Sequence, residues 1–341
     1  TVIIDESHRA GNIRTLTHKA LRKICAGSQH RFLNTATPLM NRPLDLYGIF
    51  NLIQDGCLGG YMQFLDRYTV RNKWGGVVYS INLEELAERI KPMMIRKSLE
   101  EVAPEMPPMT IEDIPFDLSE KERKLYARLV KELLFEIDRN LIEKIENPVM
   151  IQNMLTKMLV LIELSCSMEL LGKDKTSSKL EVLKERLDDI LGGDDKVIVF
   201  TQFEKMATIL FRELRKFNPL LITGQVTGKD RNEAVQKFQH DDAHKLLVST
   251  DAGGEGLNLE RGNINFHYSL PYSYGKYTQR NGRIKRLTQK KPTTVYHIIA
   301  RNSMDVFLSR MLRAKAKLSD QVLGDDRVTF TDVRTMLEFN E

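Results

Sequence analysis

The second half of the chain alternates short apolar runs with longer amphipathic stretches, and this alternation restricts the fold more than any other feature. Strands are predicted at residues 197–200, 220–223, 246–249, 264–268 and 295–299. Helices are predicted between them, at residues 179–190, 205–217, 231–239 and 277–286. Strands joined by helical crossovers pair in parallel. The sequence therefore predicts an α/β protein with a doubly wound parallel sheet, whose functional residues lie at the carboxyl ends of its strands.

The first half has a different pattern. The chain opens on the apolar run Val2-Ile3-Ile4 with no turn or cap before it, which is typical of a fragment. Ser119 and Glu122 have the spacing of a capping box and predict the start of a helix. Further elements are expected as a helix at 14–26, a strand at 31–33, mainly helices over 40–100, a helix at 149–164 and a polar hinge at 172–178.

Charge is distributed unevenly along the chain, whose net charge is +5. The segment 276–317 holds twelve Lys or Arg and one acidic residue, so the remainder of the chain is net acidic. A basic segment of this kind indicates a polyanionic partner, either nucleic acid or nucleotide phosphate, although a solvated helix face would have the same composition. The cysteines, Cys25, Cys57 and Cys166, have no metal-site spacing and predict reduced residues. No apolar run reaches 18 residues, so no membrane span is expected.

Two segments near the N-terminus combine polar residues with strand ends. Asp5-Glu6-Ser7-His8 follows the first apolar run directly. Phosphoryl transfer needs one carboxylate for Mg²⁺ and a second group for the attacking water, and Asp5 and Glu6 suit these two tasks; a helix N-cap is the simpler interpretation. Thr35-Ala36-Thr37-Pro38 ends the next strand. Its hydroxyls can link a nucleotide site to a neighbouring domain, or it is an ordinary turn before a helix.

Two further segments lie in the second half. Ser249 to Asn258 runs from a strand into a glycine-rich turn, which lets the backbone approach a phosphate or ribose, unless it is a loop without a ligand. Gln279 to Arg286 carries Arg283 and Arg286 three residues apart, on one face of a predicted helix. Two guanidinium groups on one face suit the negative charge of a transferring phosphoryl group, whereas a solvated basic helix needs no ligand.

These four segments occur in the order of motifs II, III, V and VI of superfamily 2 helicases, and their amino-acid sequences resemble those of the Swi/Snf family of DNA-translocating ATPases. The similarity extends from residue 1 to about residue 324. Further similar segments are Pro38 to Leu46, Ile95-Arg96-Lys97, Pro104 to Pro107, Ser178-Lys179-Leu180, Lys196 to Phe203, Tyr296 to Ala300 and Lys315.

The resemblance implies ATP and Mg²⁺ as cofactors and double-stranded DNA as a partner, gripped through backbone phosphates without sequence preference. It implies Asp5, with Mg²⁺, Glu6, Arg283 and Arg286 as catalytic residues. The residues implied for nucleotide binding are His8, Gly254, Glu255, Gly256 and Gln279. The residues implied for coupling and DNA binding are Thr35, Thr37, Thr201, Gln202, Ser249, Thr250 and Asn258.

The domains expected from the resemblance are the end of a first RecA-like lobe (1–110), a helical insertion (111–175), a nearly complete second lobe (176–324) and a tail (325–341). ATP is expected to bind between the lobes. The short segment of about 140 residues between Thr-Ala-Thr-Pro and Ser178 favours a compact bacterial or phage enzyme in the cytoplasm, or a nuclear one if the source is eukaryotic. The sequence makes no prediction of oligomeric state or pathway.

One departure from the family bears on activity. No Gly-x-x-x-x-Gly-Lys-[Ser/Thr] motif exists among the 341 residues, so the chain alone is predicted to be inactive as an ATPase. Two alternatives stay open: a non-catalytic nucleic-acid-binding or interaction module, and a strand-separating helicase of the same superfamily.

Overall fold

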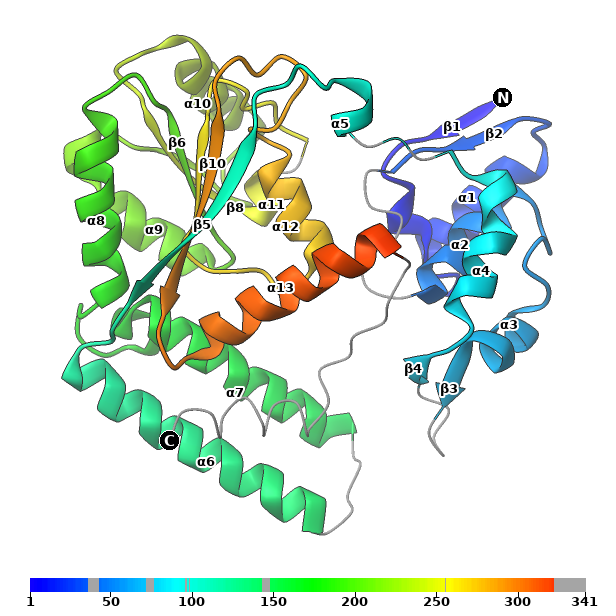
Figure 1. The fold of residues 1–341 in the computed structure, drawn as a ribbon, viewed down its shortest axis with the longest axis horizontal. Coiled ribbons are helices and arrows are strands. Elements are labelled where there is room, and N and C mark those ends of the chain that lie inside the picture. The colour runs from blue at the N-terminus through cyan, green and yellow to red at the C-terminus, as the bar shows by residue number, and fades with distance from the viewer. Residues whose placement is uncertain are drawn as a thin grey trace. The chain divides into compact units, whose positions relative to one another are not determined.

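The computed structural model describes residues 1–35, 43–71, 77–95, 97, 99–142, 148–254 and 256–321 (Figure 1). It divides into two compact units. The first unit consists mainly of Thr1–Ser98, and the second mainly of Leu99–Tyr272 and Tyr277–Met311. No helix in the described part of the chain is both long and apolar enough to cross a membrane.

The first unit contains a small parallel sheet and several helices. Strands β1 (Val2–Ile4) and β2 (Arg31–Leu33) lie where the sequence predicted strands; they pair in parallel, and α1 (Leu16–Ala26) connects them. The other elements are the 3₁₀ turn η1 (Ser7–Ala10), α2 (Pro43–Ile53), α3 (Tyr61–Tyr68), the antiparallel pair β3 (Thr69–Arg71) and β4 (Val77–Ser80), α4 (Leu83–Ile90) and η2 (Lys91–Met93). One face of the β1–β2 sheet packs on Ala10, Cys25 and Leu52.

The second unit is built on a six-stranded, all-parallel sheet in the order β5-β10-β9-β6-β8-β7. The strands are β5 (Met109–Phe116), β6 (Val197–Thr201), β7 (Leu220–Ile222), β8 (Leu246–Thr250), β9 (Ile264–His267) and β10 (Thr293–Ala300). The five strands predicted from the sequence are all present. The connecting helices are α5 (Leu99–Val102), α6 (Glu120–Ile142), α7 (Pro148–Cys166), η3 (Met168–Leu171), α8 (Ser178–Leu191), α9 (Glu204–Glu213), η4 (Arg215–Phe217), α10 (Gly228–His240), α11 (Asp251–Gly254), α12 (Tyr274–Asn281) and α13 (Met304–Gln321).

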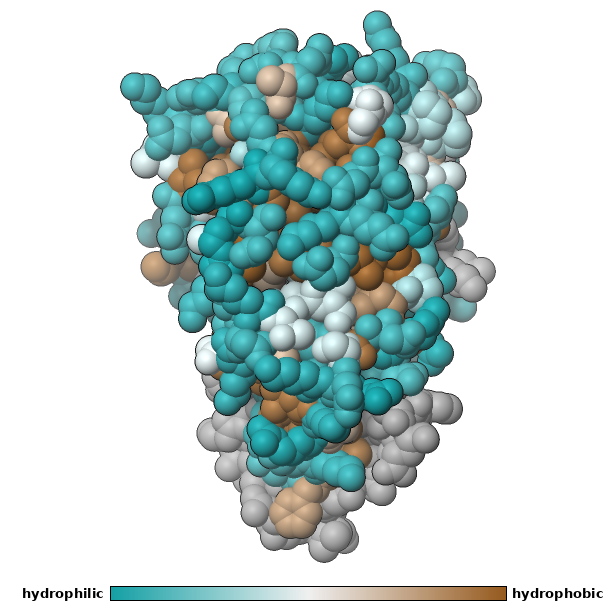
Figure 2. Space-filling model, turned by 90° about the vertical axis from the view of Figure 1, so that its left-hand side faces the viewer, coloured by the Kyte–Doolittle hydropathy of each residue, from teal (hydrophilic) through white to brown (hydrophobic). Residues whose placement is uncertain are grey.

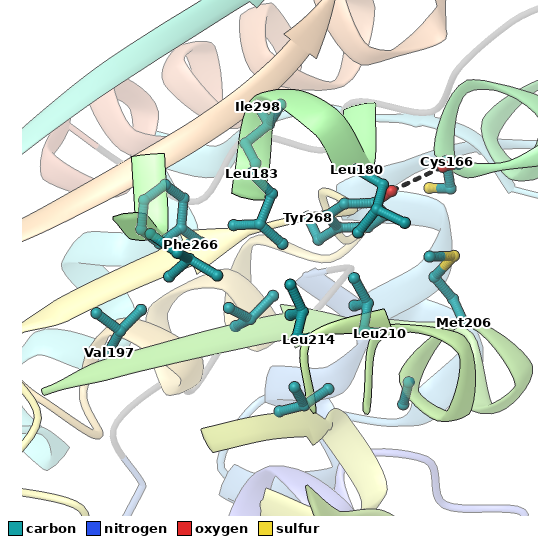
Figure 3. Close-up of a cluster of buried hydrophobic side chains, with 14 of the residues drawn as sticks. Cys166, Leu180, Leu183, Val197, Met206, Leu210, Leu214, Phe266, Tyr268 and Ile298 are labelled. Atoms are coloured by element: carbon teal, nitrogen blue, oxygen red, sulfur yellow. Dashed lines mark hydrogen bonds between the residues drawn. The ribbon is translucent and has the colours of Figure 1, made fainter. Parts of the chain in front are cut away.

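Both faces of this sheet are covered, because successive side chains of β6 point to opposite sides. Val197 and Val199 enter a core formed with α8 and α9, where Figure 3 shows the leucines of α8 and α9 around Phe266 and Tyr268. The Tyr268 hydroxyl donates to the carbonyl oxygen of Cys166 at 2.8 Å (Figure 3), which satisfies its polar atom inside an apolar cluster. Ile198 and Phe200 enter a second core with Phe238 and Ile284.

Hydrophilic residues cover most of the face of the molecule drawn in Figure 2, with several separate apolar areas among them. The predicted capping box begins α6 on the second unit: the Ser119 backbone N–H donates to the Glu122 carboxylate at 2.9 Å, and the Glu122 N–H lies 3.4 Å from Ser119 Oγ. The same carboxylate also accepts the Ser178 N–H at 3.0 Å. Glu122 is therefore buried as a shared cap for α6 and α8.

Two elements differ from the sequence expectation. The sequence analysis placed residue 111 at the start of a helical insertion, whereas β5 runs on to Phe116 and pairs with β10 over its whole length. Pro115 is tolerated there because β5 is an edge strand. A helix was predicted over residues 277–286, but α12 ends at Asn281, so the prediction was wrong for residues 282–286. Gly282 follows that residue, and Ile284 is fully buried against the sheet, which turns the chain away from the helix axis.

Candidate functional site

The carboxyl ends of β1 and β2 bring the two N-terminal motifs together. His8 Nδ1 lies 3.1 Å from Thr35 Oγ1 and 3.2 Å from Glu6 Oε2. The Glu6 carboxylate and the Thr35 hydroxyl therefore approach the same nitrogen of the His8 ring. The backbone also joins the motifs, since Ser7 N–H donates to Asn34 O at 2.9 Å. Thr37, like the rest of 36–42, lies outside the described residues.

The turn that carries Glu6 has an uncommon backbone. Glu6 has φ +49°, the left-handed region in which side chains other than Gly, Asn and Asp are uncommon. Helix α2 presses against this turn, because a Cβ on Gly48 would lie 2.0 Å from the carbonyl oxygen of Gly11. Only glycine allows this approach. The turn is thus held from both sides, by β2 and by α2.

A magnesium ion fits the chemistry of this turn. Asp5 and Glu6 are both exposed, and Asp5 Oδ1 accepts the Glu6 N–H at 2.9 Å. Mg²⁺ bound with nucleotide commonly takes one or two carboxylates from the protein and oxygen atoms from phosphate and water. Among the described residues, no group of three or more His, Cys, Asp or Glu side chains is placed to hold a metal ion.

In the second unit, the carboxyl ends of β6 and β9 are joined through Ser269. Its hydroxyl accepts the Gln202 N–H at 2.9 Å and lies 3.3 Å from Thr201 Oγ1. The Gln202 side-chain Nε2 is buried and has no hydrogen-bond partner in the described structure. Thr201 and Gln202 therefore lie at the carboxyl end of β6, the end of the strands at which the sequence predicted functional residues.

The glycine-rich segment continues directly from β8. Ser249 and Thr250 are buried in the strand, and the Gly253 N–H lies 3.4 Å from Thr250 Oγ1. Gly253 packs on the end of β7, since a Cβ there would meet the backbone of Ile222 and Thr223 at 2.6 Å. The segment is thus pinned against a neighbouring strand.

The remaining predicted residues of this segment are less closely grouped. Gly254 ends α11, and Gly256 has φ +73°. Glu255 lies outside the described residues. Asn258 has partners outside this group. Its backbone carbonyl oxygen accepts a hydrogen bond from Gln239 Nε2 at 2.9 Å. Hydrogen bonds from the side chains of Thr288 and Asn258 lower the pKa of Glu260.

Arg283 and Arg286 meet at one point, although not on a helix. Both follow α12 in the turn, and both guanidinium groups donate to the carbonyl oxygen of Leu257, Arg283 at 3.0 Å and Arg286 at 3.4 Å. Arg286 Nε is buried with no hydrogen-bond partner among the described residues. The arginine pair therefore contacts the far end of the glycine-rich segment. Gln279 lies in α12, partly buried.

Arg280 was not predicted, yet it is the most firmly held arginine of this segment, only 2% exposed. Its Nε and Nη2 donate to the two carboxylate oxygens of Asp251 at 2.5 and 3.0 Å. Its Nη1 donates to Ser269 O at 2.8 Å and lies 3.3 Å from His267 Nδ1. The sequence signal was an acid directly after a buried strand, but nothing in the sequence identified its partner.

A buried polar network continues from Arg280 into the sheet. Arginine only donates, so His267 Nδ1 accepts the hydrogen bond from Arg280 and the ring proton lies on Nε2. The Nε2–H group donates a hydrogen bond to Asn281 Oδ1 at 2.9 Å. Burial, together with the neighbouring Arg280 and His297, lowers the pKa of His267 well below its usual value. His297 in turn contacts the Tyr277 hydroxyl at 3.0 Å and Asp113 of β5 at 3.0 Å.

The basic segment 276–317 is distributed over several elements. Arg280 is buried in its ion pair, Lys291 donates to Asp194 O at 2.7 Å, and Arg301 pairs with Asp117 at 2.6 Å. The remaining basic residues lie in α12, in the turn after it, just before β10 and in α13. DNA binding by this segment stays a prediction.

Comparison with known proteins matches both halves of the chain. Residues 1–170 match the SNF2-related domain and residues 178–288 match the helicase conserved C-terminal domain. An uncharacterized ATP-dependent helicase of Mycoplasma genitalium is 27% identical over 328 residues, which are 95% of this chain and 31% of that protein. Chromodomain-helicase-DNA-binding protein 1-like of Danio rerio is 25% identical over 340 residues, 97% of this chain and 32% of its own length.

Among solved structures, the Sulfolobus solfataricus SWI2/SNF2 ATPase core in complex with dsDNA has a similar fold, with a TM-score of 0.55 and 23% identity. The match covers 98% of this chain and 70% of the Sulfolobus chain. The present chain spans about a third of the length of the curated relatives described above. The ordered motifs, the parallel six-stranded sheet and the two matched domains lead to one conclusion: the chain belongs to the Swi/Snf family of superfamily 2 helicase-like ATPases.

Proposed function

We propose that residues 1–341 are part of an ATP-dependent motor that translocates on double-stranded DNA. The observation that carries the proposal is the convergence of Arg283 and Arg286 on Leu257 O, with a buried Nε of Arg286 that has no partner among the described residues. Two guanidinium groups that converge on one backbone carbonyl are suited to an anionic ligand such as a nucleotide phosphate. The names of the relatives, an ATP-dependent helicase and an ATPase core solved with dsDNA, support nucleotide and DNA as the ligands.

Each site residue then has a chemical task. Glu6 orients and deprotonates the attacking water, and His8 holds its carboxylate from 3.2 Å. Asp5 holds Mg²⁺, which when bound neutralises charge on the phosphate oxygens. Arg283 and Arg286 leave Leu257 O to stabilise negative charge on the transferring phosphoryl group. Thr35, beside His8, is placed to report the state of the nucleotide to the segment that follows β2.

Because residues 1–341 lack the phosphate-binding motif, the test uses a protein that contains it. We call "complete motor" a protein in which residues 1–341 are joined to the phosphate-binding loop that these residues lack. ATP turnover is measured against DNA concentration for the complete motor and for Arg283→Lys and Arg286→Lys. Each variant is expected to lose turnover at every DNA concentration, because an ammonium group lacks the planar fork and an arginine of this kind contributes about 10³–10⁵ in rate.

Arg261→Lys is the matched control, since Arg261 is an exposed arginine of the same unit that pairs with Asp242 at 3.5 Å. It is expected to leave turnover unchanged. Full recovery of the Arg283→Lys and Arg286→Lys rates at saturating DNA would instead assign the pair to DNA contact, and would overturn the catalytic role. A strand-separating helicase differs from a translocase in releasing a single strand from a labelled duplex, which the same preparation tests.

A further inference from the structure

The buried ion pair of Arg280 and Asp251 lies between the two segments that hold the arginine site. Asp251 is the first residue after β8 and opens the glycine-rich segment. Arg280 is in the last turn of α12, three residues before Arg283. The two segments therefore touch twice: at their bases through the ion pair, and farther along through Leu257 O.

The geometry at Arg280 leaves little freedom. Four hydrogen bonds reach its guanidinium, two of them parallel bonds to the Asp251 carboxylate. The plane of the guanidinium also lies over the Phe200 ring, with 5.6 Å from its central carbon to the ring centroid. Because the guanidinium group is planar and rigid, these contacts fix its orientation as well as its position. In addition, Asn265 Nδ2 donates to the backbone carbonyl of Arg280 at 3.1 Å, which holds the end of α12 on the sheet.

Resting on the function proposed above, we propose that Arg280 and Asp251 are a positioning pair that places Arg283 and Arg286 for catalysis. Neither member of the pair is required to contact nucleotide. Asp251 determines where the glycine-rich segment leaves β8, and Arg280 determines where the chain leaves α12. Loss of the pair frees both segments, so that the two catalytic arginines sample positions in which they do not meet the phosphoryl group.

The test compares single and combined variants of the complete motor. Arg280→Gln is expected to lower kcat by about 10²-fold, the effect of a misplacement of roughly 1 Å, with kcat/KM falling equally and KM for ATP little changed. If Arg280 acts through Arg283 and Arg286, then adding Arg280→Gln to a variant that carries both Arg283→Ala and Arg286→Ala makes that variant no slower. Multiplication of the two effects would overturn the proposal, because independent contributions add in free energy.

A matched control separates positioning from stability. Arg212 makes a second bidentate pair in the same unit, donating to the two oxygens of Glu169 at 2.9 and 2.7 Å, and lies on α9. Arg212→Gln is expected to leave kcat unchanged. An equal loss of kcat in Arg212→Gln would mean that weakened folding explains both variants, and the positioning role would be rejected.

Asp251→Asn provides a second route if Arg280→Gln does not fold, since the amide keeps an oxygen that accepts from Arg280 Nε. The same lack of additivity with the combined Arg283→Ala and Arg286→Ala variant is expected. Failure of both variants to fold would assign the pair a purely structural role and overturn the proposal. A normal rate for Arg283→Ala alone would refute the proposed catalytic role itself, whatever Arg280 does, so the two failures are distinguishable.

Discussion

The Glu6 carboxylate is exposed, lies in a left-handed turn and is contacted by His8 at 3.2 Å. These features suit a base that must reach a water molecule outside the protein. We predict that Glu6→Gln in the complete motor abolishes ATP turnover, by at least about 10²-fold, while ATP binding is preserved because Asp5 still holds the cation. Turnover and nucleotide affinity are measured on the same preparation. A variant that hydrolyses ATP at nearly the normal rate would remove Glu6 from the chemistry.

His267 predicts a pH dependence of stability. It is buried and neutral, and its folded pKa lies well below the unfolded value of about 6.5. As the pH falls below about 6.5, the unfolded state takes up a proton at this histidine that the folded state does not. The free energy of unfolding therefore decreases, by at most about 1.4 kcal/mol per pH unit. The stability contribution is fully present above the unfolded pKa.

The measurement is denaturant unfolding of residues 1–341 between pH 7 and pH 5. His267→Gln is expected to flatten the pH dependence relative to the natural sequence, even if it lowers stability at pH 7. His240→Gln serves as the control, because His240 is exposed in the folded chain and its replacement should leave the slope unchanged. Equal slopes in all three proteins would show that His267 is not the group that responds to acid.

At the scale of elements, the contact of α2 with the Glu6 turn is the tightest packing in the first unit. Gly48→Ala places a Cβ 2.0 Å from Gly11 O, where only backbone can yield. We expect a loss of about 1–3 kcal/mol of stability, and faster hydrogen exchange of the amides of β1 and η1. Gly27→Ala is the control, since nothing lies within 4 Å of its Cβ, and it should change stability by about 0.5 kcal/mol or less. Similar effects at both positions would exclude a specific contact.

The sheet of the second unit was predictable because its strands are apolar runs buried on both faces. Such runs mark strand positions without reference to the partner strand. β5 escaped prediction for the opposite reason: as an edge strand it is exposed along much of its length and contains Pro115, so its sequence has neither an apolar run nor clean alternation. α12 was extended too far because helical spacing continues to Arg286, while the burial of Ile284 ends the helix earlier.

The candidate site divides in the same way. Motif residues at or near strand ends, such as Glu6 and Thr250, could be singled out because strand ends can be predicted from local sequence. Arg280 was missed because its partner Asp251 is 29 residues away, and only the parallel pairing of β6 with β8 and β9 brings their ends together. Long-range pairing of buried polar groups is a property of the folded sheet, and no local pattern encodes it.

On the scale of the whole molecule, DNA binding and ATP hydrolysis are expected to be separable. The 341 residues carry both arginines and the Glu6 turn but no Gly-x-x-x-x-Gly-Lys-[Ser/Thr] motif. That motif supplies backbone N–H groups and a lysine to the phosphates.

We therefore predict that purified residues 1–341 bind double-stranded DNA weakly, without sequence preference and without DNA-stimulated ATP turnover above a Glu6→Gln control. Binding through backbone phosphates releases counterions, so log K should fall linearly with log salt, with a slope of about 0.9 per phosphate contacted. Fluorescence anisotropy with two duplexes of equal length and different sequence, titrated over a range of salt concentrations, measures both properties. An affinity that stays flat with salt, or a strong preference for one duplex, would exclude a phosphate-tracking surface. Turnover by the chain alone would show that residues within it bind the phosphates without the missing motif.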